Sequence, residues 1–414
     1  MKFNLFSKTN KLTLIALFGN MIAAILNYLF HFLSGKILSV NNFGQLESFI
    51  GLFAITSVLT GAIGPVIINQ ITHNSPKKIS SIILFFQNKL IAMSFVLTLI
   101  LSIGYPVFNS ILKNENFFIY LLFLIQIISS FYLIFYQSIL QAQFKIFTFL
   151  LLGIFFSLSK IFFIFIFFHL GFSDIVSNLS LSLSYAFTAI ISAIIINRQL
   201  SKNTAKQFSV SLKKLASFSF LSLVTNFFLT IIINQDTIIA RYFLSESSAG
   251  SYAAISLVSK IIFFFSTAIL IVYYPLFNQN DNKRHLNKLL LTGMMFIVLV
   301  CAGFVLIYSL YPSLILSLLF GTKFIAAANM LPLLSIFMFF LSIFYFLIQF
   351  LLSQQNSSSA FVSGITVLTQ TILILFYHQS LTNIIYSMMV PIIPAIVFSW
   401  YYSKQIIKIK HYNY

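Results

Sequence analysis

Long apolar runs recur along this chain, and only short polar or turn-rich breaks separate them. Of the 414 residues, 59% are hydrophobic and 7% are charged, whereas a soluble protein carries about 25% charged residues. Because an ordinary protein core could not bury this much apolar sequence, we expect the runs to cross a lipid bilayer as helices. The sequence therefore predicts an all-α, polytopic membrane protein.

The positions of the runs predict twelve transmembrane helices. Their approximate bounds are 12–34, 43–68, 83–104, 117–140, 147–168, 178–197, 214–240, 249–274, 288–311, 328–352, 360–378 and 384–402. The first run is long enough to span and lacks a small-residue cleavage site, so we interpret it as a helix of the mature protein.

The basic residues between the runs predict the orientation of the chain. Lys36, Lys113, Arg241 and Lys323 fall in one set of connections, Lys160 and Lys260 fall inside apolar runs, and the other basic residues fall in the opposite set. Under the positive-inside rule, this asymmetry predicts that both termini are cytoplasmic. The net charge of +18 is thereby explained as a topology signal, and we expect no nucleic-acid partner.

The chain reads as two halves joined by a basic linker at about 198–213. The exit from the first predicted helix reads SGKILSVNNFGQLESF, and the exit from the seventh reads ARYFLSESSAGSYAAI. In these segments Lys36 corresponds to Arg241, and Gly44 corresponds to Gly250. The sequence thus predicts two six-helix lobes, 1–200 and 201–414, as parallel repeats, which is a transporter pattern.

Lys160 and Lys260 lie near the middle of apolar runs, where a charge costs about 2.5–3.5 kcal/mol. Gly153 and Ser157 share a helical face with Lys160, and Ser256 shares one with Lys260, so we expect both lysines to face protein or a water-filled cavity. Two buried cations in a chain with only 6 acidic residues favour binding of an anion.

Asp236 is the only acid well inside a predicted helix, so an ion pair with one lysine is the alternative. On an ideal helix Asp236 points about 160–200° away from the face of Asn234, and it lies in the outer part of its helix. We therefore expect at least one central lysine to lack a carboxylate partner, and Arg241 is an alternative partner for Asp236. Asp236 is also a candidate for binding a coupling cation, and His31 for carrying a proton.

Polar residues form stripes on the first and seventh predicted helices. The stripes are Asn20, Asn27, His31 and Ser34, and Asn226, Thr230, Asn234, Thr237 and Arg241. Such stripes either hold helices together or contact a polar ligand. Asn27, Asn226 and Asn234 are our candidates for contacts with substrate.

Motifs for catalysis, nucleotide binding and metal binding are absent from the sequence. A chain with so few acids is a poor candidate for a paired-carboxylate or divalent-metal site, and the single cysteine, Cys301, excludes an intrachain disulfide. We predict no catalytic residue, no metal, no cofactor and no enzymatic activity. Without an ATP-binding domain, transport would use an ion gradient, the membrane potential or a substrate gradient.

Two segments carry a resemblance to a known family. They read FLSGKILSVNNFGQLESFIGLFAITSVLTGAIGPVIINQ, and NQDTIIARYFLSESSAGSYAAISLVSK with an acid, a cation five residues on and then a glycine. With twelve helices in two halves, the chain resembles the oligosaccharide flippases of the polysaccharide transporter family. That family belongs to the multidrug/oligosaccharidyl-lipid/polysaccharide exporter superfamily.

The resemblance implies two lobes around a central cavity and transport by alternating access. It further implies movement of an undecaprenyl-diphosphate-linked oligosaccharide across a bacterial inner membrane for O-antigen, capsule or related polysaccharides, with a polysaccharide polymerase and a chain-length regulator as partners. Lys160 and Lys260 match, in type and depth, the cavity cations that bind the diphosphate or acidic sugars, and Arg241 and Lys36 would lie at the outer mouth. The scarcity of cavity arginines departs from the family pattern.

Three other functions are compatible with the sequence. A multidrug cation antiporter of the same superfamily should have an acidic cavity, and a membrane polymerase or glycosyltransferase should have a long catalytic loop on the outer face. A flippase for a lipid-linked peptidoglycan precursor is the third.

Overall fold

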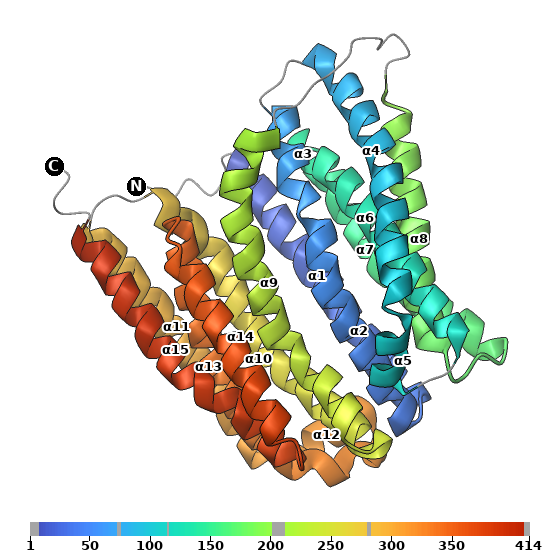
Figure 1. Ribbon diagram of the computed structural model, residues 1–414, viewed down its shortest axis with the longest axis vertical. Coiled ribbons are helices and arrows are strands. Elements are labelled where there is room, and N and C mark those ends of the chain that lie inside the picture. The colour runs from blue at the N-terminus through green and yellow to red at the C-terminus, as the bar shows by residue number, and fades with distance from the viewer. Residues whose placement is uncertain (1–7, 73–75, 114–115, 201–211, 280–282, 410–414) are drawn as a thin grey trace. The chain divides into compact units, whose positions relative to one another are not determined.

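The computed structural model describes residues 8–72, 76–113, 116–200, 212–279 and 283–409 (Figure 1). Within these ranges the chain is built from helices and contains no strand. The helices are α1 (Lys8–Ile37), α2 (Val40–Gly61), α3 (Ile63–Thr72), α4 (Pro76–Ile103), α5 (Tyr105–Leu112), α6 (Phe117–Ala142), α7 (Ile146–His169), α8 (Val176–Asn197), α9 (Leu212–Phe243), α10 (Glu246–Gln279), α11 (Lys283–Leu310), α12 (Pro312–Phe320), the 3₁₀ helix η1 (Thr322–Met330), α13 (Leu331–Ser353), α14 (Ser358–Phe376) and α15 (Leu381–Ile409). Residues 201–211 of the predicted linker lie outside the described residues.

Eleven helical segments of the described residues are long and apolar enough to cross a membrane. They correspond to the second through twelfth predicted spans, and α1 corresponds to the first. With 30 residues, α1 is about 45 Å long, which exceeds a hydrocarbon core of about 30 Å. The prediction of an all-α, polytopic membrane protein is confirmed.

The segment predicted as one helix over 43–68 consists of α2 and α3, which are interrupted at Ala62. Pro65 lacks the amide hydrogen that would bond to the carbonyl of Gly61, and its ring clashes with that carbonyl in a continuous helix. The break therefore follows from the Gly–Pro sequence at Gly64 and Pro65, which the hydropathy pattern does not register.

Two connections predicted as loops form the short helices α5 and α12. Both begin at a Tyr–Pro pair, Tyr105–Pro106 and Tyr311–Pro312, and a proline in the first helical turn loses no intrahelical bond. The two pairs are separated by the same interval as Gly44 and Gly250. The internal repeat therefore extends beyond the segments in which the sequence first indicated it.

The chain folds into two compact units, which we treat separately. Unit 1 comprises Met1–Asn42 and Thr56–Ser219, and unit 2 comprises Phe43–Ile55 and Phe220–Tyr414. The first half of α2 thus packs with the second half of the chain. The predicted division into lobes 1–200 and 201–414 assigns the whole of α2 to the first lobe. That division stays a prediction.

In unit 1, α8 packs against both α6 and α7. One face of α8 carries buried hydroxyl residues at intervals of four: Ser180, Ser184, Thr188 and Ser192. Ser184, Thr188 and Ser192 each donate a hydrogen bond to the carbonyl four residues earlier. Small side chains whose hydroxyls are satisfied within their own helix allow close helix packing in lipid.

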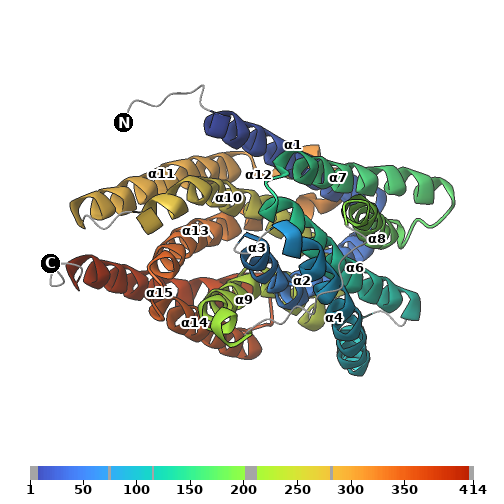
Figure 2. The same ribbon diagram turned by 90° about the horizontal axis from the view of Figure 1, so that it is seen from above.

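In unit 2, α13 packs against α10, α11 and α15 and lies between them when the unit is viewed from above (Figure 2). Most of α13 is buried, including Phe337, Phe344 and Phe346. A helix that is apolar on all sides is expected at the centre of a bundle.

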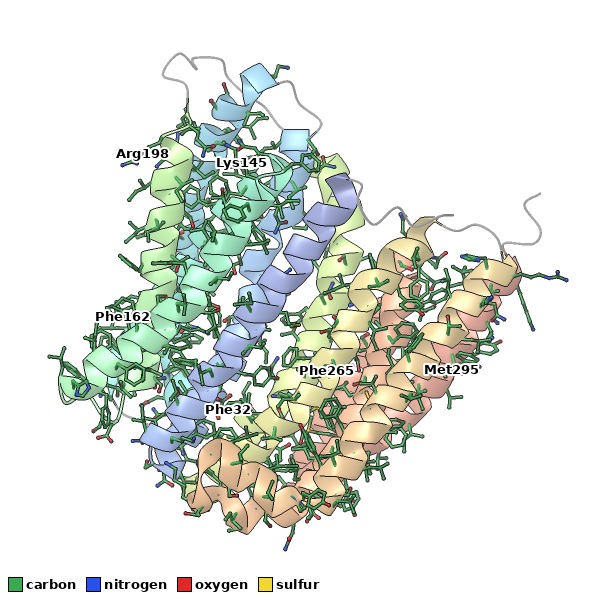
Figure 3. The ribbon with its side chains drawn as sticks, turned by 180° about the vertical axis from the view of Figure 1, so that it is seen from behind. Phe32, Lys145, Phe162, Arg198, Phe265 and Met295 are labelled. Atoms are coloured by element: carbon green, nitrogen blue, oxygen red, sulfur yellow. The ribbon has the colours of Figure 1, made fainter. Side chains whose placement is uncertain are left out.

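Large apolar side chains also cover the outside of both units (Figure 3). Phe162 on α7, Phe265 on α10 and Met295 on α11 are exposed, and Met295 is 70% accessible. Exposed apolar surface of this extent on spanning helices is expected where lipid is the solvent.

Gly44 on α2 and Gly250 on α10 bring the backbones of two helices of unit 2 close together. A Cβ atom built on Gly44 would lie 2.7 Å from both the Cα atom and the backbone nitrogen of Gly250. The pair matched by the sequence repeat is therefore the pair that meets in space. Nearby, the Ser48 hydroxyl donates to the carbonyl of Thr237 at 3.0 Å and fastens the same half of α2 to α9.

We expect Gly44→Ala to lower the thermal stability of the purified protein because its methyl group would force α2 and α10 apart. The matched control is Gly303→Ala on α11, where an added Cβ meets nothing within 4 Å. There the substitution should be neutral or stabilise by about 0.5–1 kcal/mol, because alanine favours helix. Equal melting temperatures for the two variants would contradict the close approach of the two helices.

Candidate functional site: two buried lysines

Lys160 on α7 is buried in unit 1, with 1% of its surface accessible. Its ammonium group donates a hydrogen bond to Oδ1 of Asn27 on α1. It also lies 4.8 Å from the ring centroids of both Phe30 and Phe156. The partners of the charge are thus an amide oxygen and two aromatic faces, all of them electrically neutral.

The surroundings of Lys160 follow from helix geometry. Phe156 precedes it by four residues and so lies on the same face of α7. Ser157, also on this face, donates to the carbonyl of Ala23 at 3.2 Å and holds α7 against α1. The prediction that Lys160 faces protein is confirmed by its burial. Among the described residues, no carboxylate pairs with it.

Lys260 on α10 has a different environment. Its ammonium lies 3.3 Å from Oδ1 of Asp236 on α9, and the carboxylate of Asp236 is fully buried. Oδ2 of Asp236 accepts hydrogen bonds from the hydroxyls of Ser256 at 2.5 Å and Tyr252 at 3.3 Å. Tyr252, Ser256 and Lys260 are spaced by four residues, so α10 presents three donors in a row to one carboxylate.

Asp236 lies in the outer part of its helix and nevertheless reaches a central lysine. Every Cβ of a helix tilts toward the N-terminus, so the Lys260 side chain points back along α10 toward Ser256, and both side chains reach the carboxylate of Asp236. In the antiparallel pair α9–α10, that direction leads toward the level of Asp236. In this structure the alternative of a structural ion pair therefore applies to Lys260.

Arg241, the alternative partner for Asp236, pairs with a different acid. Arg241 is buried, and its guanidinium lies 3.5 Å from Oε1 of Glu246, whose side chain is 42% exposed. Lys36, its counterpart in the sequence repeat, is exposed in the last turn of α1. The two residues thus occupy different environments in their own units.

The candidate residues Asn226 and Asn234 form hydrogen bonds within unit 2. Asn226 donates to the carbonyl of Ser222 at 2.8 Å and accepts from Nε2 of Gln349 at 3.3 Å. Asn234 donates to the carbonyl of Thr230 at 2.9 Å. These bonds favour helix packing over ligand contact for this stripe. His31 is buried, and its ring centroid lies 5.5 Å from that of Phe30.

Sequence reasoning missed a polar network on the other side of α9. Nε2 of Gln235 donates to Oε1 of Gln370 on α14 at 2.7 Å, and Oε1 of Gln235 accepts from Thr371 at 3.2 Å. Nε2 of Gln370 continues to the carbonyl of Met388 on α15 at 2.7 Å. The available signal was the position of Gln235 beside Asp236 inside an apolar run. The described residues contain no cluster of His, Cys, Asp and Glu side chains that could hold a metal ion.

No family model matches this chain, and no curated protein matches it in sequence. Its fold is nevertheless shared with solved transporter structures. One, described as the inward-facing conformation of a multidrug resistance MATE family transporter of the MOP superfamily, has a TM-score of 0.75 at 14% identity, with 94% of this chain and 96% of that chain covered. Another, described as the lipid II flippase MurJ in an inward closed conformation, has a TM-score of 0.72 at 14% identity, with 94% and 87% covered.

A structure described as the outward-facing conformation of a MATE family transporter has a TM-score of 0.63 at 15% identity, with 97% of this chain and 95% of that chain covered. At these identities the likeness shows a common fold. The chain is thus a multi-pass membrane protein with the two-lobed helical fold of these transporters.

Proposed function

We propose that the chain is a flippase that moves undecaprenyl-diphosphate-linked oligosaccharide units across the bacterial inner membrane by alternating access, for O-antigen, capsule or a related surface polysaccharide. The observation that carries the proposal is Lys160, a membrane-embedded cation whose described partners are all neutral. A neutral environment leaves its charge available to an anion, and a diphosphate is the anion that such a lipid carries.

The alternative role as a multidrug transporter has the support of the fold, because two of the similar structures are named as multidrug transporters. Lys160 weighs against it, since a buried cation repels a cationic drug. The described residues contain four acids, and two of these, Asp236 and Glu246, pair with cations of the chain itself. The flippase role also has support from the fold, because one similar structure is named as a lipid II flippase.

Purified protein in liposomes tests the two roles directly. A lectin added outside would report exposure of the glycan of an undecaprenyl-diphosphate-linked oligosaccharide, and ethidium uptake would report drug transport. We expect the protein to accelerate glycan exposure and to leave ethidium uptake unchanged. Ethidium transport without glycan exposure would overturn the proposal in favour of the multidrug role.

We also propose that both termini are cytoplasmic and that a polysaccharide polymerase and a chain-length regulator act on the flipped units. Lys145 and Arg198, which the positive-inside rule places on one side, lie at the same end of unit 1 (Figure 3). In a Cys301→Ser background, Lys408→Cys should react with an impermeant thiol reagent only after the membrane is opened, whereas Lys113→Cys should react in intact cells. The reverse pattern would contradict this orientation.

A further inference from the structure

The start of α11 and the end of α15 meet in unit 2 and gather several cations there. The ammonium of Lys404 donates a hydrogen bond to Oδ1 of Asn287 at 2.6 Å and joins the two helices. Arg284 and Lys288 follow one another at a spacing of four on α11, as Lys404 and Lys408 do on α15. We call these four residues the α11–α15 basic cluster.

This arrangement of charges is unfavourable without an anion. Like charges four residues apart on a helix repel by about 0.2–0.5 kcal/mol, and both helices contain such a pair. The first turn of α11 contains no acid, although the positive end of the helix dipole favours one there. The basic cluster therefore adds cations to a helix end that is already positive.

The described acids of unit 2 do not neutralise the lysines of this cluster. Asp236 pairs with Lys260 and Glu246 pairs with Arg241, and no described carboxylate pairs with Lys288, Lys404 or Lys408. Asp281 precedes α11 in the sequence but lies outside the described residues. Within the described residues, the charges of these three lysines are therefore available to an external anion.

The cluster lies at the ends of two apolar spans, where the headgroup region of a bilayer is expected. The apolar span Arg284–Leu310 begins at the cluster, and the apolar span Leu381–Lys408 ends at it. The Lys404 ammonium lies 4.3 Å from the centroid of the Trp400 ring, and tryptophan is enriched at the membrane interface. Trp400 is the only tryptophan of the chain.

An exposed apolar stripe continues from the cluster down α15. Val390, Val397 and Tyr401 lie on the helical face of Lys404 and Lys408, and each of them is more than half exposed, at 54%, 62% and 55%. A cationic end above an exposed apolar stripe matches a phospholipid, which carries its phosphate above its acyl chains. A soluble phosphate has no apolar part that could contact the stripe.

We propose that the α11–α15 basic cluster binds the phosphodiester headgroup of an anionic bilayer phospholipid, with Trp400 beside the upper part of the acyl chains. Basic residues between helix ends attract anionic lipids by about 1 kcal/mol per residue near the surface. This site is separate from Lys160 and does not depend on the transported substrate.

Quenching of Trp400 by brominated lipids tests the proposal, because bromine on an acyl chain quenches only a tryptophan that it contacts. The full chain would be placed in phosphatidylcholine bilayers containing equal fractions of brominated phosphatidylglycerol or brominated phosphatidylcholine. We expect roughly two- to fivefold tighter binding of phosphatidylglycerol at the Trp400 position. Equal quenching by the two lipids would overturn the proposal.

Matched variants distinguish binding of phosphatidylglycerol at the α11–α15 basic cluster from a general attraction of this lipid to the positively charged protein. The triple variant Lys288→Gln, Lys404→Gln, Lys408→Gln should lose the preference, and Lys408→Gln alone should reduce it if the triple variant fails to fold. The control Lys78→Gln, Lys89→Gln, Lys145→Gln removes the same charge from exposed positions of unit 1 and should keep the preference. A preference that survives in the triple variant would overturn the proposal. Loss of the preference on adding inorganic phosphate, but not chloride of equal ionic strength, would also overturn it by making free phosphate the ligand.

Discussion

Asp236→Asn is expected to destabilise unit 2 by about 3–5 kcal/mol, because it leaves the ammonium of Lys260 buried without a counter-charge. The two charged groups are 3.3 Å apart, and the carboxylate is inaccessible, so water cannot replace the lost partner. Lys260→Met should cost a similar amount, because the carboxylate of Asp236 then keeps only the hydroxyls of Ser256 and Tyr252. The measurement is the melting temperature of the detergent-solubilised protein by size-exclusion chromatography after heating.

The double variant Asp236→Asn, Lys260→Met should recover most of the loss, because removing both charges also removes the cost of burying them. Asp174→Asn is the control, since it removes an exposed carboxylate that accepts one hydrogen bond, from Asn42 at 3.1 Å. Exposed polar and charged contacts contribute about 0–1 kcal/mol, so this variant should melt near the wild type. A double variant less stable than either single variant would contradict a simple ion pair.

The Asp236–Lys260 pair shows which part of the site the sequence can and cannot predict. Helical phase correctly places Asp236 on the face of α9 opposite Asn234. The polar stripe of Asn226 and Asn234 marks one side of α9, but α9 is buried on the Asp236 side as well, where Leu229 and Ile232 are also inaccessible. Apolar residues look alike whether they face lipid or protein, so periodicity cannot detect a second buried face.

The helices themselves were predictable because a bilayer requires long apolar segments with satisfied backbone groups. The short elements were not, because they depend on local backbone chemistry. Pro65 causes the break between α2 and α3, and prolines lie in the first turns of α5 and α12. Packing of the first half of α2 with unit 2 rests on Gly44 and Ser48, which contact residues about 200 positions away in the sequence. The repeat marked Gly44, but it did not show that the two matching glycines touch.

The composition of the chain made the aromatic neighbours of Lys160 hard to predict. The chain contains 52 phenylalanines, so no single one stands out. The spacing of four between Phe156 and Lys160 was visible, but the contribution of Phe30 and Asn27 from α1 required the tertiary structure. Those contacts indicate that the lysine is held in place by groups that do not cancel its charge.

Lys160→Met is expected to raise the thermal stability of the protein while it reduces flipping about tenfold or more. An uncompensated charge at the bilayer centre costs about 2.5–3.5 kcal/mol, and methionine fills a similar volume between Phe30 and Phe156 without that cost. A charge-assisted hydrogen bond to an anionic substrate contributes about 1.5–3 kcal/mol, which sets the expected loss of transport. Glycan exposure in liposomes and the melting temperature of the same preparation give the two measurements.

The opposite signs distinguish a substrate-binding lysine from a structural one, since functional residues are commonly retained at a cost in stability. Lys160→Arg keeps the charge and should retain more flipping than Lys160→Met. The double variant Asp236→Asn, Lys260→Met removes the other central lysine together with its counter-charge and should flip within a few-fold of the wild type. A Lys160→Met protein that melts earlier and still flips normally would assign Lys160 to packing, and the proposed function would lose its main support.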